Sequence, residues 1–139
     1  MSKWCICCNS SIFNISGAVK DKKDIFLKRN AGIIQGDIIY IYVSRPYSKI
    51  MYKAIAENTD CSKENMKFLS DYLSVPFEEL KDGDYLRLKL LGEFTGDETS
   101  YRAVLGNGLS TIQGPSRVKK QLEDYLDLIE NKSMYKEIK

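Results

Sequence analysis

Apolar and polar positions alternate most clearly over residues 36–50, GDIIYIYVSRPYSKI, where a Gly-Asp turn leads into an extended segment. Because side chains alternate across a strand, one face would carry Ile39, Ile41 and Val43. The opposite face would carry Tyr40, Tyr42 and Ser44. The aliphatic face predicts contact with the core, and residues 45–48 predict the loop of a hairpin that returns over residues 49–56. The tyrosine face, which ends beside Arg45, is the first candidate for a function.

The remaining elements follow from the same kinds of pattern. Strands are predicted over residues 3–9, 85–91 and 101–105, with a short apolar segment over residues 25–27. A cap at Ser10 or Ser11 predicts a short helix up to about residue 19, and a second helix is predicted over residues 63–73. The strongest helix covers residues 116–131, and the lysine-rich tail after it is expected to fray. Its apolar stripe consists of Val118, Leu122, Tyr125, Leu126 and Ile129.

Strands and helices do not alternate one for one, which argues against a parallel, doubly wound sheet. The order predicts a single α+β domain over residues 1–139. Its expected architecture is a small, partly open β-barrel of five to six mostly antiparallel strands with flanking helices. An open barrel has a mouth, and the mouth is a natural place for a ligand.

Composition and charge narrow the class of protein. A chain of 139 residues with 43% apolar and 29% charged residues is typical of one soluble domain. No apolar run approaches the roughly 18–20 residues that cross a bilayer, and the start MSKWCICC lacks the features of a signal peptide. We therefore expect a cytoplasmic protein with no membrane partner. Residues 1–59 hold nine Lys or Arg against four Asp or Glu, which suits a polyanionic partner as well as ordinary surface scatter.

The cysteines and the lack of histidine limit the chemistry. Cys5 and Cys8 have CxxC spacing, but a structural zinc site needs four ligands, and only Cys7 and Cys61 remain. Buried thiols acting as small apolar groups are the favoured interpretation. With no histidine there is no imidazole base, and neither GxGxxG nor GxxxxGK[ST] occurs. The sequence therefore predicts a binding protein that is not an enzyme and uses no metal or cofactor.

Several short segments, taken in order, resemble the EVE domain, a member of the PUA-like superfamily related to the YTH readers of modified RNA. The segments are Trp4, Asn9-Ser10, Phe26-Leu27-Lys28-Arg29-Asn30, Gly36-Asp37, Tyr42-Val43-Ser44, Ile50–Glu57 and Gln113-Gly114-Pro115-Ser116-Arg117. Together they span most of the chain. Phe26 stands where many members of the family have tryptophan.

The resemblance implies a PUA-like barrel whose pocket reads a modified base, for example a methylated one, in DNA or RNA. The expected aromatic walls are Phe26, Tyr42 and Trp4. The groups expected to contact the base edge are Asn9, Ser10 and Ser44, with Ser110 and Gln113 in the segment that closes the pocket. The cations expected to hold phosphates are Lys28, Arg29 and Arg45. The oligomeric state is left open.

Each of these residues also has a structural explanation. Trp4 and Phe26 suit a core, and Asn9 and Ser10 suit the cap of a helix. Tyrosine favours strands whatever its function, and the cations suit a solvated rim or a hairpin loop.

Two other functions compete with base reading. The related ASCH group includes amidohydrolases that act on acetylated cytidine, which would need a lysine, a threonine and a glutamate together. Glu57 and Thr59 fall at the far end of the return strand, and no GxKxxExR-like signature occurs. The third alternative is a protein-interaction module with a decayed pocket, in which side chains would fill the mouth of the barrel.

Overall fold

The computed structural model of the chain describes residues 1–22, 24–29, 31–109 and 114–138. Within these ranges, seven strands form one sheet in the order β2-β5-β4-β3-β1-β6, with β7 paired to β5. The strands are β1 (Lys3–Cys8), β2 (Asp24–Lys28), β3 (Ile38–Val43), β4 (Lys49–Cys61), β5 (Tyr85–Phe94), β6 (Ser116–Arg117) and β7 (Tyr135–Glu137). The α-helices are α1 (Ile15–Lys22), α2 (Tyr101–Gly106) and α3 (Lys120–Glu130), and the 3-10 helices are η1 (Lys63–Tyr72) and η2 (Phe77–Glu79).

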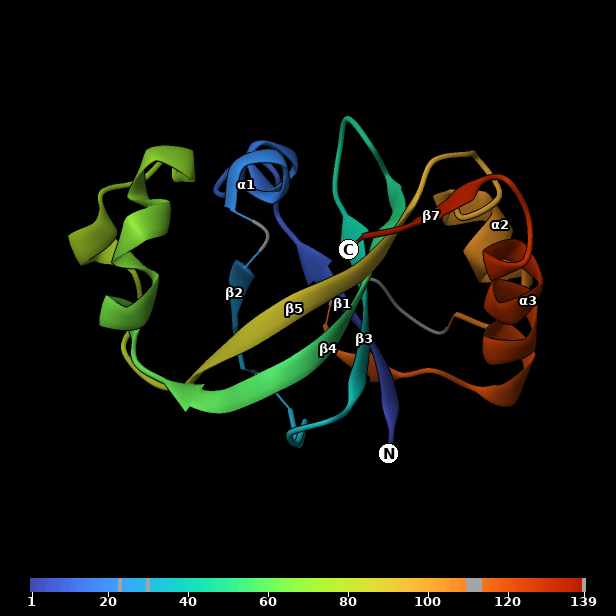
Figure 1. Cartoon of the computed structure of the whole chain (residues 1–139), viewed down its shortest axis with the longest axis horizontal. Helices are drawn as coiled ribbons and strands as arrows, with labels where there is room; N and C mark the ends of the chain where they lie inside the picture. The colour runs from blue at the N-terminus through green and yellow to red at the C-terminus, as the bar shows by residue number, and fades with distance from the viewer. Residues whose placement is uncertain (23, 30, 110–113, 139) are drawn as a thin grey trace.

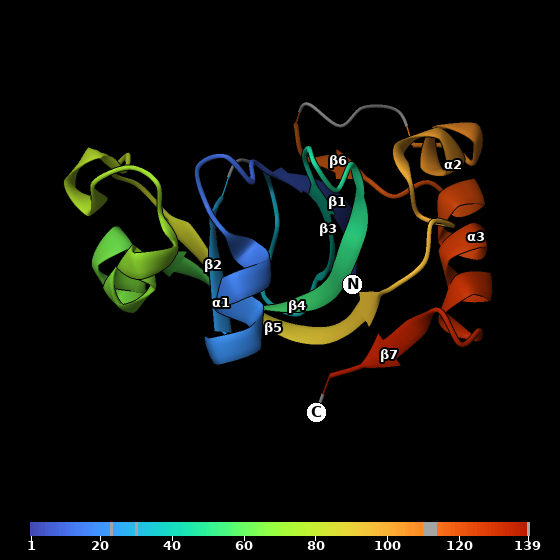
Figure 2. The same cartoon turned by 90° about the horizontal axis from the view of Figure 1, so that it is seen from above.

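The sheet is mixed because β1 lies parallel to β3, whereas the β3–β4, β4–β5 and β2–β5 pairs are antiparallel. The strands curve but the sheet does not close, since β2 and the β1–β6 pair lie at opposite ends of the strand order (Figure 2). The α+β class and the open architecture are confirmed, with the short strands β6 and β7 in addition. The parallel register brings the carboxyl ends of β1 and β3, at Cys8 and Val43, to one edge.

Both faces of the sheet are covered, so the protein has two apolar clusters. Ile39, Ile41 and Val43 belong to one cluster. Ile38, Tyr40 and Tyr42 belong to the other, together with Leu122, Leu126 and Ile129 of α3. All six residues of β3 are buried, so the tyrosine side is a second core face over most of its length. In Figure 1, α2 and α3 lie at one end of the molecule and the η1–η2 lobe lies at the other.

The predicted helix at residues 116–131 is confirmed as α3, although its first residues form β6 and the helix begins at Lys120. A half-buried polar cluster fixes α3 to the sheet. Lys53 Nζ lies 2.6 Å from Glu130 Oε1, and the Tyr40 hydroxyl donates to Glu130 Oε2 at 3.2 Å. Burial and the neighbouring Glu130 carboxylate raise the pKa of Tyr40, so this hydroxyl stays protonated and keeps donating.

The end of the chain is ordered by a close contact rather than frayed. β7 pairs with β5, with Gly92 opposite Glu137 and Phe94 opposite Tyr135. A Cβ at position 92 would lie 2.0 Å from the Tyr135 hydroxyl, so only glycine leaves room for that ring. The expectation of a frayed tail is therefore wrong for residues 135–137.

Two further elements differ from their predictions. Residues 101–105 form the helix α2 and not a strand, because a five-residue apolar segment carries too little periodicity to separate the two. Residues 63–72 are helical as predicted but of the tighter 3-10 type, with Met66 and Leu69 buried. No helix among the described residues has the length and apolar character needed to span a membrane.

Candidate functional site

The carboxyl ends of β1 and β3 open into a cavity of about 640 Å³. A volume of this size is typical of small-ligand pockets. We call this hollow the main cavity. It is lined by Cys7, Asn9, Ser11, Tyr42, Ser44, Arg45, Ser48 and Tyr101. These residues come from the end of β1 and the turn after it, the end of β3, the β3–β4 hairpin and the first residue of α2, so distant parts of the sequence meet here.

Two tyrosines form the aromatic part of the main cavity. Tyr42 is only 3% exposed, whereas Tyr101 is 41% exposed. Their ring centroids lie 6.5 Å apart in an edge-on arrangement. Burial raises the pKa of Tyr42, and a hydrogen bond with Ser48 partly offsets that effect. Tyr42 is therefore a fixed wall, and Tyr101 presents a free aromatic face.

Backbone contacts hold Tyr101 at the cavity. The Tyr101 N–H donates to the Ser48 carbonyl at 2.9 Å, which ties the start of α2 to the hairpin. Ser48 has a φ of +51°, a left-handed conformation that costs a non-glycine residue energy. The hairpin therefore holds a strained residue where it meets both tyrosines. Strain of this kind is common at functional sites.

A set of short polar side chains forms the opposite wall. The Ser11 N–H and hydroxyl both donate to Asn9 Oδ1, at 3.0 and 2.7 Å. The Ser10 N–H donates to Ser44 Oγ at 3.0 Å, and the Ser10 hydroxyl donates to the Arg45 carbonyl. Ser10 is absent from the cavity lining, so the structure gives it the role of positioning Ser44. Asn9 and Ser44 both line the cavity.

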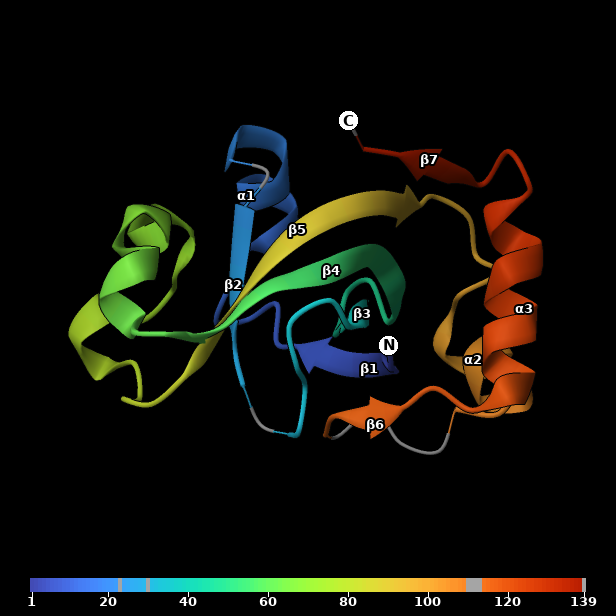
Figure 3. The ribbon, with the colours of Figure 1, turned by 60° about the horizontal axis from the view of Figure 1, so that its bottom comes forward.

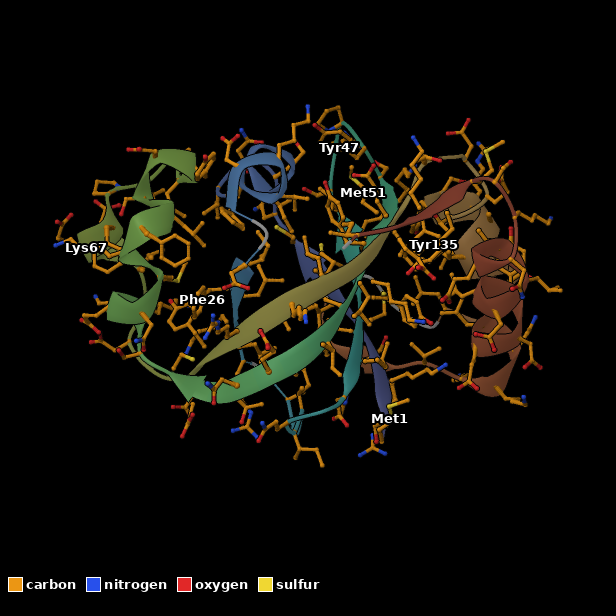
Figure 4. The ribbon with its side chains drawn as sticks, viewed as in Figure 1. Met1, Phe26, Tyr47, Met51, Lys67 and Tyr135 are labelled. Atoms are coloured by element: carbon orange, nitrogen blue, oxygen red, sulfur yellow. The ribbon has the colours of Figure 1, made fainter. Side chains whose placement is uncertain are left out.

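Arg45 supplies the positive charge at the rim. Its side chain is exposed, and no ion pair to it occurs among the residues that the structure describes. Tyr47, which is also exposed, lies at the hairpin tip and points out from the molecule (Figure 4). The Tyr47 hydroxyl is 3.2 Å from Ser16 Oγ, which links the tip to α1. Arg45 is thus free to meet an anion at the cavity.

Trp4 does not line the main cavity, which corrects the sequence-based assignment. It is buried, and its indole Nε1–H donates to Asp37 Oδ2 at 3.0 Å. Because β1 and β3 are parallel and Trp4 pairs with Ile39, Trp4 lies toward the amino end of the pair. The cavity lies at the carboxyl end. On its other side the ring is covered by Arg117, whose Cζ lies 5.0 Å from the centroid.

Phe26 is also separate from Tyr42. It lies on β2, is buried, and packs edge-on against Phe68 of η1 at 5.8 Å between centroids. Figure 4 shows Phe26 beside the η1 lobe, well apart from Tyr47 at the hairpin tip. The three predicted aromatic walls therefore do not meet, because Phe26 and Trp4 stabilise the first apolar cluster.

Lys28 and Arg29 are engaged by a neighbouring turn. Lys28 Nζ donates to the carbonyls of Asp82 and Asp84 at 3.1 and 3.4 Å. Arg29 lies 4.0 Å from the Asp84 carboxylate. Neither residue lines the main cavity, so the structure does not bring them to Arg45 as predicted. The predicted contacts Ser110 and Gln113 lie outside the described residues.

A smaller cavity of about 250 Å³ adjoins the main one. It is lined mostly by apolar residues from β1, β2 and the loop after β1: Ile6, Cys7, Cys8, Asn9, Ile12, Phe13, Leu27, Lys28, Gly114 and Pro115. We call it the seam cavity, because β1 and β2 are the strands between which the open sheet fails to close. Cys7 and Asn9 line both cavities and form the divider between them.

Two of the four cysteines are buried as the sequence predicts, whereas Cys7 is exposed and Cys61 is half-buried. Cys5 and Cys8 are buried in different apolar clusters, since residues three apart on a strand face opposite sides. Burial raises the pKa of each thiol to about 12, and no cluster of metal-ligating groups occurs in the described residues. Cys7 is exposed at the divider.

Sequence reasoning missed four lining residues, Cys7, Ser11, Ser48 and Tyr101. The sequence predicts a strand at Tyr101, and a strand there does not place its ring beside Tyr42. Cys7 was foreseeable, because its strand position alternates with the buried Ile6 and Cys8.

Solved structures share this fold, although no protein-family model and no curated protein sequence matches the chain. ZmASCH from Zymomonas mobilis aligns with a TM-score of 0.61 at 14% identity, covering 91% of this chain and 94% of that one. A mutant of ZmASCH gives 0.63 at 12% identity, with 92% and 96% covered. Atu2648 from Agrobacterium tumefaciens gives 0.57 at 12% identity, with 94% and 92% covered.

The chain therefore shares its fold with these ASCH structures. Identities of 12–14% establish the fold alone. The function has to be argued from the site, because one fold serves many functions.

Proposed function

We propose that this protein is a nucleic-acid-binding module that takes an unpaired base into the main cavity and is not an enzyme. The observation that carries the proposal is the combination of three features in one hollow. They are the exposed ring of Tyr101, the polar wall of Asn9 and Ser44, and the unpaired cation Arg45. The resemblance to EVE domains and the shared PUA-like fold support the same class of partner.

Each feature matches one part of a nucleotide. Stacking of a base on an aromatic ring contributes about 1–3 kcal/mol, and Tyr101 has a free face for it. The Asn9 amide and the serine hydroxyls offer donors and acceptors to a base edge. Arg45 would meet a flanking phosphate, which adds affinity without selecting a sequence.

The finer proposal is that the base is a modified one, for example methylated. Burial of one methyl group is worth about 0.8 kcal/mol, roughly a fourfold preference. Such a preference is large only where the walls fit the methyl closely. The rigid Tyr42 wall, fixed by burial, is the part of the cavity suited to that fit.

A binding screen tests the proposal. The purified protein would be titrated against labelled single-stranded DNA, single-stranded RNA and duplexes, each with and without base modifications, and fluorescence anisotropy recorded. We expect single strands to bind more tightly than duplexes and one modification to bind best. Equal and weak binding to all of these oligonucleotides would remove the proposal.

An ASCH-like amidohydrolase is the competing enzymatic function. It would bring a lysine, a threonine and a glutamate together, and the main cavity as lined by described residues contains none of the three. Glu57 and Thr59 lie near the end of β4, whereas β4 begins at the hairpin beside the cavity. Incubation with acetylated cytidine should therefore release no acetate, and release above that of a heat-denatured sample would favour the enzyme.

A further inference from the structure

Two residues form the divider between the two cavities. Cys7 and Asn9 line both hollows, so a ligand in the main cavity lies one side chain away from the seam cavity. Cys7 is exposed, so a ligand that spans both cavities can contact its side chain. Successive bases along a stacked strand are separated by about 3.4 Å, a spacing that a single side chain can bridge.

The chemistry of the two hollows is different. The main cavity has hydroxyl, amide and guanidinium groups that distinguish one base edge from another. The seam cavity has Ile6, Ile12, Phe13, Leu27 and Pro115, which offer flat or aliphatic contact, and its hydrogen-bonding side chains are Asn9 and Lys28. Apolar contact with the face of a base is tolerant of sequence, because every base has such a face. At about 250 Å³, this cavity suits a base without its sugar and phosphate.

The seam also has a free strand edge. β6 pairs with β1 only at Trp4 and Cys5, so within the described residues no strand pairs with residues 6–8 on that side. Peptide groups of an unpaired strand edge are available for hydrogen bonds. They would add contacts to any base of the right size.

We propose that a single-stranded nucleic acid crosses the Cys7–Asn9 divider, so that two neighbouring nucleotides bind at once. The main cavity discriminates its base, and the seam cavity holds the adjoining base with little regard to identity. This inference rests on the proposed function and names its ligand as a single strand of at least two nucleotides. The open seam of the barrel becomes part of the binding site.

An abasic scan tests the inference. Single-stranded pentamers with one abasic position each would be titrated against the whole protein. We expect two adjacent positions at which loss of the base weakens binding about tenfold. A change of base identity should alter the affinity at only one of these two positions. Sensitivity at a single position would overturn the inference and leave the proposed function intact, whereas no binding of any pentamer would overturn both.

A pair of variants locates the second base. Ile12 is 41% exposed and lines only the seam cavity. With Ile12→Asp, loss of the base that lies in the seam cavity should no longer weaken binding, whereas loss of the base in the main cavity should weaken it as before. Ile34 is an exposed isoleucine that lines neither cavity, so Ile34→Asp should leave both penalties unchanged. Equal weakening at both positions by Ile12→Asp would contradict the two-site arrangement.

The thiol at the divider gives an independent measurement. In a Cys61→Ser background, a maleimide should modify Cys7, since Cys5 and Cys8 are buried. A bound pentamer should slow this reaction at least tenfold, and prior modification should block pentamer binding. Modification at the same rate with and without a pentamer that binds would show that the strand does not cross the divider.

Discussion

The two ends of the parallel strand pair β1–β3 differ in the exposure of their polar side chains. At the amino end, the Asp37 carboxylate accepts hydrogen bonds from the Ser2 N–H, the Trp4 indole and the Ile34 N–H, at 2.9, 3.0 and 3.0 Å. Asp37 is 1% exposed, so this end is closed. At the carboxyl end, Tyr101 and Arg45 are exposed around the main cavity.

The contrast separates stability from binding along a single pair of strands. Three donors satisfy a buried charge at one end, which holds the two strands in register. At the other end, Tyr101 is exposed and Arg45 has no ion pair among the described residues, so both side chains are available to a ligand. We expect substitutions at the amino end to alter unfolding, and those at the carboxyl end to alter binding.

The largest effect should come from the closed end. Asp37→Asn replaces an acceptor-only carboxylate that three donors surround, and it should lower the free energy of unfolding by about 3 kcal/mol. Urea denaturation measures the loss. Asp60→Asn, at an exposed aspartate, is the matched control and should stay within about 0.5 kcal/mol of the parent.

The same residue sets a dependence on pH. Burial raises the pKa of Asp37, but the hydrogen bonds from Ile34, Ser2 and Trp4 outweigh it, so the pKa is lowered overall. A lowered pKa in the folded state means that stability from Asp37 is present above the ordinary value of about 3.9. It is lost as the pH falls through the folded value. Asp37→Asn should reduce the loss of unfolding free energy at acid pH. An unchanged loss at acid pH would contradict the assignment of this pH dependence to Asp37.

The next largest effect concerns the exposed ring at the open end. Tyr101→Ala should weaken binding of a single-stranded oligonucleotide about 10- to 100-fold, since stacking contributes about 1–3 kcal/mol. Phe68→Ala removes a similarly exposed ring, 47% against 41%, on the η1 lobe and should leave binding unchanged. If both variants bind alike, Tyr101 is not a stacking platform.

Arg45→Ala should have a smaller and uniform effect. Loss of one phosphate contact reduces the slope of log K against log salt by about 0.7 for a single strand. Arg29→Ala is the sharpest control, because the sequence groups Arg29 with Arg45 whereas the structure pairs it with Asp84. If both variants reduce the salt slope equally, both arginines contact phosphates, as the sequence predicts.

The smallest effect is expected at Ser10, which contacts Ser44 and Arg45 from behind the cavity wall. Ser10→Ala removes one hydroxyl donor and should cost about 1 kcal/mol of stability. Binding should weaken only a few-fold through a looser Ser44. Calorimetry can measure both the stability and the binding of this variant. A residue that contacted the ligand directly would, when replaced, weaken binding and leave stability unchanged.

The sequence predicts strands and helices well where the hydrophobic pattern repeats over many residues. The alternation in β3 identifies its aliphatic core face, and the stripe of α3 identifies the buried face of that helix, because each repeats several times. The same alternation does not reveal that the tyrosine face of β3 is buried as well. The prediction fails at α2, where Tyr101–Leu105 is too short to show a period. The pairing of β1 with β3 is also invisible, because residues 35 positions apart meet there, as in Lys3 with Ile38.

That hidden pairing explains the errors in the site. Trp4 and Asn9 lie in or just after the same strand, and a list of sequence features places them together. The parallel register puts them at opposite ends of the strand pair. Phe26 belongs to β2, which pairs with β5 and lies at the far edge of the strand order (Figure 3).

The path of β1 has a consequence for how the binding function is gained and lost. This first strand lies between β3 and β6, so both of its pairings are possible only after residues 38–43 and 116–117 have been synthesised. A nascent or partly opened molecule in which this strand is unpaired lacks the Trp4–Asp37 contact and the part of the cavity wall that Cys7 lines. Ligand capture and cooperative folding should thus appear together during synthesis and vanish together on heating.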